Sequence, residues 1–146
     1  MQPNEVRVLV VEDDAKIREA WGAMIRSTPD MKIVGLLSSA DHLLEECRNS
    51  RPHVVLLDLK MPGRDALEAL SETLTVLPET RTVVYTALSD QRLIRKAIEA
   101  GAWAYMDKLE EPNAVVDTIR RIARMSAPQT SSRNSESLQF QGGGDR

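Results

Sequence analysis

The sequence predicts an α/β fold built from repeated βα units around a parallel β-sheet. Short apolar segments alternate with stretches of helical periodicity from residue 6 to about residue 125, which is typical of such units. The middle apolar segments are almost uninterrupted runs of Val and Leu, as expected for strands buried on both faces. With 146 residues and 42% hydrophobic content, the chain can form one domain with a genuine core, but not two.

Five strands and five helices are expected in alternation. The strands are predicted at residues 6–11, 32–37, 53–57, 82–85 and 103–106. Between them, apolar residues recur at the spacing of an amphipathic helix. The five resulting stripes are Ile17, Ala20, Trp21, Met24 and Ile25; Ala40, Leu43, Leu44 and Cys47; Leu67, Leu70, Leu74 and Leu77; Ile94, Ala97 and Ile98; and Val115, Ile119 and Ile122. Each stripe gives its helix one side that faces the core.

Several residues are suited to begin or end these helices. Asp65 with Glu68 has the spacing of a capping box at the start of the third helix. Pro112 is suited to the first turn of the fifth helix, and Gly101 to the end of the fourth. Asp14, which follows the first strand, is more readily explained as a helix cap than as a site residue.

Composition excludes several classes of protein. A net charge of −3 gives no overall basic field, so we expect no direct nucleic-acid binding by this chain. Its single cysteine, Cys47, rules out an internal disulfide and is expected in the core. No segment approaches the roughly 18 consecutive apolar residues of a membrane span, and the N-terminus lacks a signal-peptide pattern. We therefore expect a cytoplasmic protein without membrane contact.

The end of the sequence differs in composition from the rest. Residues 1–125 are predicted to form the domain, whereas residues 126–146 are rich in Ser, Gln and Gly. This segment has too little apolar surface to offset the entropy of ordering and is expected to be a flexible tail or linker. Phe140, the chain's only phenylalanine, leaves open a short partner-binding motif there.

Chemically versatile residues follow the predicted strands. Ligands of open parallel sheets bind beyond the carboxyl ends of the strands, so these residues are expected to meet at one edge. They are Glu12, Asp13 and Asp14 after the first strand, Asp58 after the third, Thr86 after the fourth and Lys108 shortly after the fifth.

Taken singly, most of these residues have an ordinary structural explanation. Thr86 alone would be a strand-forming residue, and Lys108 alone a surface lysine. An ordinary structural explanation fits Asp58 poorly, because a carboxylate at the end of a buried strand beside other carboxylates needs a positive charge near it. A metal ion or Lys108 could supply that charge, and clustered carboxylates of modest number favour Mg²⁺. His42 and His53 lack a ligand partner at useful spacing.

Together, the residues have what phosphoryl transfer to a carboxylate requires. Asp58 would be the nucleophile, and Mg²⁺ would be held by Asp13 and, through water, by Glu12. Lys108 and the Thr86 hydroxyl would contact phosphoryl oxygens. Because the chain has no phosphate-binding loop of the Walker type, the donor must come from another molecule.

Four segments resemble the bacterial response-regulator receiver domain. They are VLVVEDD (8–14), VVLLDLKMPG (54–63), VVYTA (83–87) and GAWAYMDK (101–108), and the resemblance covers residues 5 to 125. It implies a flavodoxin-like, doubly wound, five-stranded parallel sheet of order 2-1-3-4-5 with five helices. The segments at residues 27–46 and 114–125 are most similar to receivers that precede a LuxR-type DNA-binding domain.

The resemblance also implies roles for individual residues. Asp58 would be the phosphorylation site, Glu12 and Asp13 the acidic pair, and Lys108 the phosphate-contacting lysine. Thr86 and Tyr105 would be the switch residues, and Lys60 would offer its backbone carbonyl to the metal. The donor would be a phosphohistidine on a sensor histidine kinase or a phosphotransfer protein. The fourth helix, fifth strand and fifth helix would form the output face and a homodimer contact, controlling transcription through a separate domain.

Two positions depart from the family pattern. Leu109 follows Lys108 where many receivers have proline, so we expect a trans bond there, since a cis bond would cost about 2.5 to 4 kcal/mol. Ala66 replaces a glycine common in the family and is expected to stiffen the start of the third helix.

Two other classes of protein are alternatives to a phosphoacceptor. A phosphatase of the haloacid-dehalogenase type would need an acid two residues after its nucleophile, whereas Lys60 stands two residues after Asp58; we therefore expect no enzyme of that kind. A module acting through protein contacts alone would not need the set Asp13, Asp58, Thr86 and Lys108. Phosphate incorporation from acetyl phosphate distinguishes these alternatives.

Overall fold

The computed structural model describes residues 4–87 and 91–126 and has the expected doubly wound α/β architecture. Five parallel strands form one sheet in the order β2-β1-β3-β4-β5, as expected. The strands are β1 (Val6–Val11), β2 (Met31–Leu37), β3 (Val54–Asp58), β4 (Arg81–Thr86) and β5 (Ala104–Asp107). The helices are α1 (Ala15–Arg26), α2 (Leu43–Ser50), α3 (Ala66–Val76), α4 (Gln91–Glu99) and α5 (Pro112–Arg124).

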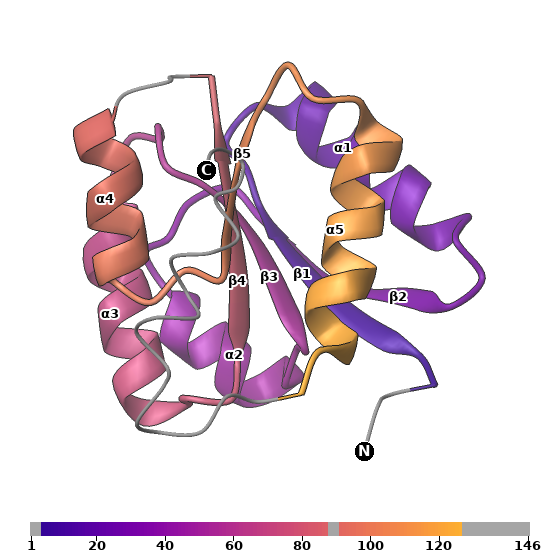
Figure 1. Cartoon of the computed structure of the whole chain (residues 1–146), viewed down its shortest axis with the longest axis horizontal. Coiled ribbons are helices and arrows are strands. Elements are labelled where there is room, and N and C mark those ends of the chain that lie inside the picture. Colours follow the sequence, from indigo (N-terminus) through magenta and orange to yellow (C-terminus); the bar gives the residue numbers. More distant parts are fainter. Residues whose placement is uncertain (1–3, 88–90, 127–146) are drawn as a thin grey trace.

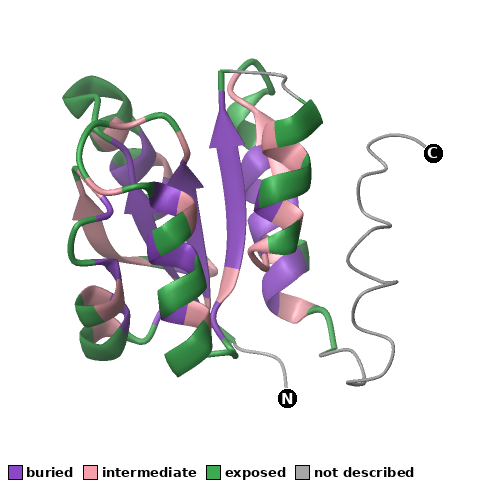
Figure 2. Ribbon diagram, turned by 90° about the vertical axis from the view of Figure 1, so that its left-hand side faces the viewer, coloured by how far each residue is buried: buried purple, intermediate pink, exposed green. Residues whose placement is uncertain are grey.

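Helices cover both faces of the sheet (Figure 1). Because successive side chains of a strand point to opposite faces, Val8 and Val10 pack toward α1 and α5, whereas Leu9 and Val11 pack toward the other helices. The two resulting cores explain why the central strands are apolar at every position. Figure 2 shows this arrangement as buried strands between helices whose outer faces are exposed.

The helix ends agree with most of the sequence signals. The Asp14 side chain caps α1 by accepting hydrogen bonds from the backbone N–H groups of Lys16 and Ile17. Asp65 caps α3 in the same way, and Pro112 occupies the first turn of α5. The expected return bond from the Asp65 N–H to the Glu68 carboxylate is not among the described contacts, and this carboxylate lies 3.7 Å from the Arg64 guanidinium.

Some boundaries differ from the prediction. Ala40 precedes α2 and Leu77 follows α3, although both side chains are buried. Asp58 and Thr86 are the last residues of their strands rather than the first residues beyond them, since the ladder continues through the Asp58–Tyr85 and Thr86–Asp107 pairs. The Lys108–Leu109 peptide bond is trans, as expected.

Ion pairs tie α5 to the sheet. Asp30, just before β2, lies 2.8 Å from Arg120 and 3.0 Å from Arg124.

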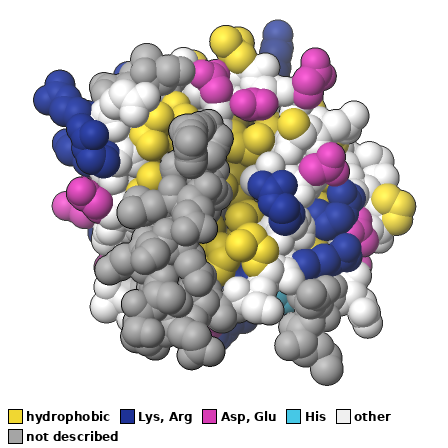
Figure 3. Space-filling model, viewed as in Figure 1, with side chains coloured by type: hydrophobic (Ala, Val, Ile, Leu, Met, Phe, Trp, Pro, Cys, Tyr) yellow, Lys and Arg dark blue, Asp and Glu magenta, His cyan; other side chains and the backbone are white. Residues whose placement is uncertain are grey.

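Lys and Arg side chains gather over α5 on the face shown in Figure 3, with acidic side chains among them. Within the part of the chain that is described, no helix has the length and apolar character needed to cross a membrane. The predicted tail, apart from Ser126, and Phe140 lie outside the described residues.

Cys47 allows a direct test of how α2 packs. Its side chain is fully buried, and burial raises the pKa of the thiol to about 12. An unfolded cysteine has a pKa of about 8.5, so near pH 9 only the unfolded chain carries much reactive thiolate. We expect a disulfide reagent to label the native chain at least about a hundredfold more slowly than the urea-unfolded chain near pH 9.

The raised pKa of the Cys47 thiol also predicts how stability depends on pH. The folded thiol keeps a proton that the unfolded thiol loses, so the free energy of unfolding should fall as pH rises from about 9 toward 12.

Cys47→Ser provides the unlabelled control for the thiol-labelling experiment. Equal labelling of the native and the unfolded chain would show that Cys47 is not in the core.

Candidate functional site

An acidic cluster lies at the carboxyl edge of the sheet. Glu12 directly follows β1, and Asp58 ends β3, its neighbour in the sheet. One oxygen from each of Glu12, Asp13 and Asp58 lies within 4.8 Å of the others. Glu12 and Asp58 are buried, whereas Asp13 is exposed. The structure thus brings these three carboxylates together, and the cluster can hold a metal ion.

Lys108, which follows the edge strand β5, contacts this cluster with its side chain. Its Nζ atom lies 3.0 Å from Glu12 Oε1 and 3.0 Å from Asp58 Oδ2. The backbone N–H of Lys108 donates to the Thr86 carbonyl at 2.9 Å, so the end of β4 fixes where the lysine leaves the sheet. One ammonium therefore pairs with both buried carboxylates.

The protonation of the three groups follows from this pairing. Burial raises the pKa of Asp58 above its usual value, and the N–H of Lys60 and the Lys108 ammonium offset only part of that effect. Burial acts in the same direction on Glu12, but hydrogen bonds from Tyr85, the Asp14 backbone and Lys108 outweigh it and lower its pKa. Burial disfavours the charged form of Lys108, yet its two carboxylate partners raise its pKa. A charged lysine between two carboxylates is the arrangement these contacts favour.

The remaining predicted residues surround the cluster. The Thr86 hydroxyl oxygen is buried and has no hydrogen-bond partner among the described residues. Lys60 is exposed, and its backbone N–H donates to Asp58 Oδ1 at 3.0 Å. Tyr105 is half-buried on β5 and packs against the core on the side of α2, α3 and α4. The switch roles of Thr86 and Tyr105 and the metal role of the Lys60 carbonyl stay predictions.

Two aromatic residues belong to the site although the sequence placed them only in the core. The Tyr85 hydroxyl donates to Glu12 Oε1 at 2.5 Å. Trp21 Nε1 donates in turn to the Tyr85 hydroxyl at 2.9 Å. The available signal was chemical: a buried Tyr or Trp has a polar group that needs a partner.

Arg18 is a further residue that the sequence did not single out. Its guanidinium donates to the backbone carbonyl of Glu12 at 2.9 Å and to that of Asp13 at 3.2 Å. These contacts tie the first turns of α1 to the loop that carries the acidic pair. Arg18 therefore fixes the backbone from which two of the three clustered carboxylates project.

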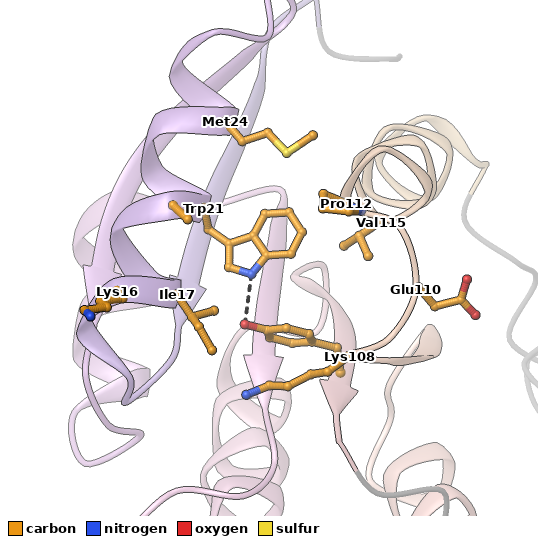
Figure 4. A pocket seen from close by; sticks show the side chains of 10 residues that line it. Lys16, Ile17, Trp21, Met24, Lys108, Glu110, Pro112 and Val115 are labelled. Atoms are coloured by element: carbon orange, nitrogen blue, oxygen red, sulfur yellow. Dashed lines mark hydrogen bonds between the residues drawn. The ribbon is translucent and has the colours of Figure 1, made fainter.

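A groove lies between α1 and α5 beside the cluster. Its volume is about 390 Å³, and its lining includes Trp21, Met24, Val115, Tyr85 and Lys108. In Figure 4 the Trp21 ring extends from α1 into this groove, and the Lys108 side chain passes along its lower end. The groove and the acidic cluster therefore share Tyr85 and Lys108.

Comparisons with known proteins identify the family of the chain. The family model for the response regulator receiver domain matches residues 8–120. The response regulator GacA of Pseudomonas protegens is 32% identical over 117 residues, which are 80% of this chain and 55% of that protein. The transcriptional regulatory protein LiaR of Bacillus subtilis is 29% identical over 119 residues, 82% of this chain and 56% of LiaR. The chain thus spans about half the length of the curated relatives it matches.

A solved structure extends the comparison to the fold. The two-component response regulator of the LuxR family from Aurantimonas sp. SI85-9A1 superposes with a TM-score of 0.77 at 26% identity, covering 92% of this chain and 98% of that one. Such relatives agree with the resemblance to receivers of LuxR-type regulators. Since the family model covers most of the sequence and the expected strand order is present, the chain belongs to the receiver domain family of two-component response regulators.

Proposed function

We propose that Asp58 accepts a phosphoryl group from a phosphohistidine of a sensor histidine kinase or phosphotransfer protein. The observation that supports this most is the arrangement around Asp58: a buried carboxylate, a lysine paired to it, and, at the end of the next strand, a hydroxyl for which the described part of the chain offers no partner. Each of these groups would have a role in binding a phosphoryl group.

Asp58 is oriented for nucleophilic attack by two donors on different oxygens. The N–H of Lys60 binds Oδ1 at 3.0 Å, and Lys108 binds Oδ2 at 3.0 Å. In the proposed reaction a carboxylate oxygen forms a bond to phosphorus with its lone pair as the phosphorus–nitrogen bond of the phosphohistidine breaks and its electron pair returns to the imidazole. The product is an acyl phosphate on Asp58.

Mg²⁺ is the metal that the donor set favours. The cluster offers three carboxylates, which suit a hard cation and leave coordination positions free, so the ion would keep several waters. Asp13 and Asp58 would hold it, with Glu12 acting through water and the Lys60 carbonyl as a further ligand. When bound, Mg²⁺ neutralises negative charge on the phosphoryl oxygens.

Lys108 and Thr86 are suited to hold the phosphoryl group once it has been transferred. A phosphoryl group brings roughly two negative charges, so Lys108 would turn from the carboxylates to an oxygen of the new group. The Thr86 hydroxyl would donate a charge-assisted hydrogen bond to another oxygen. Its side chain would move inward to do so, and Tyr105 on the neighbouring strand would follow into the space it leaves.

The expected consequence is a change on the face formed by α4, β5 and α5. Thr86 and Tyr105 flank this face, and a coupled movement of the two is a local event that can alter a contact surface. Homodimerisation through this face, and control of transcription by a separate DNA-binding domain, would transmit the signal. The regulatory names of relatives such as LiaR support this output.

Phosphoryl uptake tests the role of Asp58. With acetyl phosphate and Mg²⁺, intact-mass measurement should show one added phosphoryl group that is lost at alkaline pH, as acyl phosphates are. Asp58→Asn should take up none, because its amide is not a nucleophile at neutral pH. Equal labelling of the variant and the parent, or a base-stable adduct, would refute the assignment.

The metal assignment is tested by two neighbouring substitutions. Asp13→Asn removes one ligand charge and should weaken Mg²⁺ binding by about tenfold or more, measured by tryptophan fluorescence or NMR titration. Asp14→Asn is the matched control, since Asn also caps helices well and Asp14 is already engaged at the start of α1. If Asp13→Asn binds Mg²⁺ as tightly as the parent, the metal site lies elsewhere.

A further inference from the structure

A chain of hydrogen bonds connects the α1–α5 groove to the acidic cluster. Trp21 Nε1 lies 2.9 Å from the Tyr85 hydroxyl, and that hydroxyl lies 2.5 Å from Glu12 Oε1. The dashed line in Figure 4 marks the first of these bonds, which crosses from α1 to the sheet. All three side chains are buried, with exposed fractions of 8% or less. If one of their hydrogen-bonding groups is removed, water does not readily take its place.

The direction of these two hydrogen bonds follows from the groups that donate them. The indole N–H of Trp21 can only donate, so it occupies a lone pair on the Tyr85 oxygen. The Tyr85 hydroxyl proton is then left to point at Glu12, whose ionised carboxylate can only accept. Bonds aligned in this way polarise one another and are stronger together than separately.

Tyr85 and Lys108 share one oxygen of Glu12. Tyr85 binds Oε1 at 2.5 Å and Lys108 binds the same atom at 3.0 Å, whereas the backbone N–H of Asp14 binds Oε2. The Lys108 ammonium also lies 5.1 Å from the centre of the Tyr85 ring, within range of a cation–π contact. When Lys108 leaves Oε1, Tyr85 still satisfies that oxygen. Without Tyr85, the lysine would be the one described partner left to Oε1 and would be harder to release.

We propose that Tyr85 is a positioning residue, which holds Glu12 so that Lys108 can exchange its carboxylate partners for a phosphoryl group and let a metal ion enter. Trp21 fixes the Tyr85 hydroxyl and thereby couples the α1–α5 groove to the acidic cluster. The phosphoryl-transfer part of this proposal rests on the proposed function of Asp58. The coupling is reciprocal, so metal binding at the cluster changes the surroundings of Trp21 in the groove.

The variant Tyr85→Phe removes the hydroxyl and keeps the ring. We expect Mg²⁺ affinity and the rate of phosphoryl uptake from acetyl phosphate each to fall by roughly tenfold, the effect of one hydrogen bond to a charged group. Trp21→Phe should act in the same direction to a smaller extent. Trp103→Phe is the matched control, because Trp103 is a buried indole whose ring stacks on Arg81, outside the cluster. Tyr85→Phe values within twofold of the parent would overturn the proposal.

The indole N–H resonances provide a readout that a purely structural role would not move. The chain has two tryptophans, so Trp103→Phe assigns both signals in a ¹⁵N–¹H spectrum. Adding Mg²⁺ to the unmodified chain should shift the Trp21 signal more than the Trp103 signal, and this shift should be lost in Tyr85→Phe.

These measurements remain decisive in the less favourable cases. If Tyr85→Phe does not fold, a Trp21 signal in the unmodified chain that ignores bound Mg²⁺ overturns the coupling, and a shifted signal supports it. If no protein is labelled at Asp58, the proposed phosphoacceptor function fails, while the Mg²⁺ titrations still decide whether Tyr85 positions Glu12.

Discussion

The pairing of one lysine with two buried carboxylates is the interaction on which the site depends. Glu12 directly follows β1 and Asp58 ends the neighbouring strand β3, and two buried carboxylates so close together require a compensating cation. Lys108 follows β5, the edge strand that β4 separates from β3, yet its ammonium contacts both carboxylates. The order of the strands and the bond from Lys108 N–H to the Thr86 carbonyl make these contacts possible. The arrangement of the strands thereby places Lys108 beside the carboxylates of Glu12 and Asp58.

This pairing also explains how the site can respond to phosphate. The lysine satisfies two carboxylates, while the buried Thr86 hydroxyl has no hydrogen-bond partner within residues 4–87 and 91–126. A phosphoryl group on Asp58 would supply acceptors for both, and a metal ion would take over the charge that Lys108 now balances. Tyr85 would keep Glu12 in place during that exchange. A response of this kind requires a site whose donors can change partners without leaving a buried charge alone.

The sequence predicted the elements and the site edge because both follow from local patterns. Alternating apolar runs indicate βα units, and parallel strands bring their carboxyl ends to one edge; Glu12, Asp13, Asp58 and Lys108 are accordingly together. The ends of β3 and β4 were less predictable, since pairing between strands decides whether Asp58 or Thr86 still belongs to the ladder. Tyr85, Trp21 and Arg18 were missed because their polar partners lie on other elements or in the backbone, and apolar periodicity does not reveal such contacts.

The central claim is that the phosphoryl group is attached to Asp58, and chemical trapping tests it most directly. Sodium borohydride reduces an aspartyl phosphate to homoserine, which marks the position of attachment. Trypsin, which spares the Arg51–Pro52 bond, should release a peptide of residues 49–60 in which Asp58 is the only acidic residue. After treatment with acetyl phosphate and Mg²⁺, we predict homoserine at position 58, detected by peptide mass spectrometry. Homoserine at another carboxylate, with Asp58 unchanged, would contradict the account.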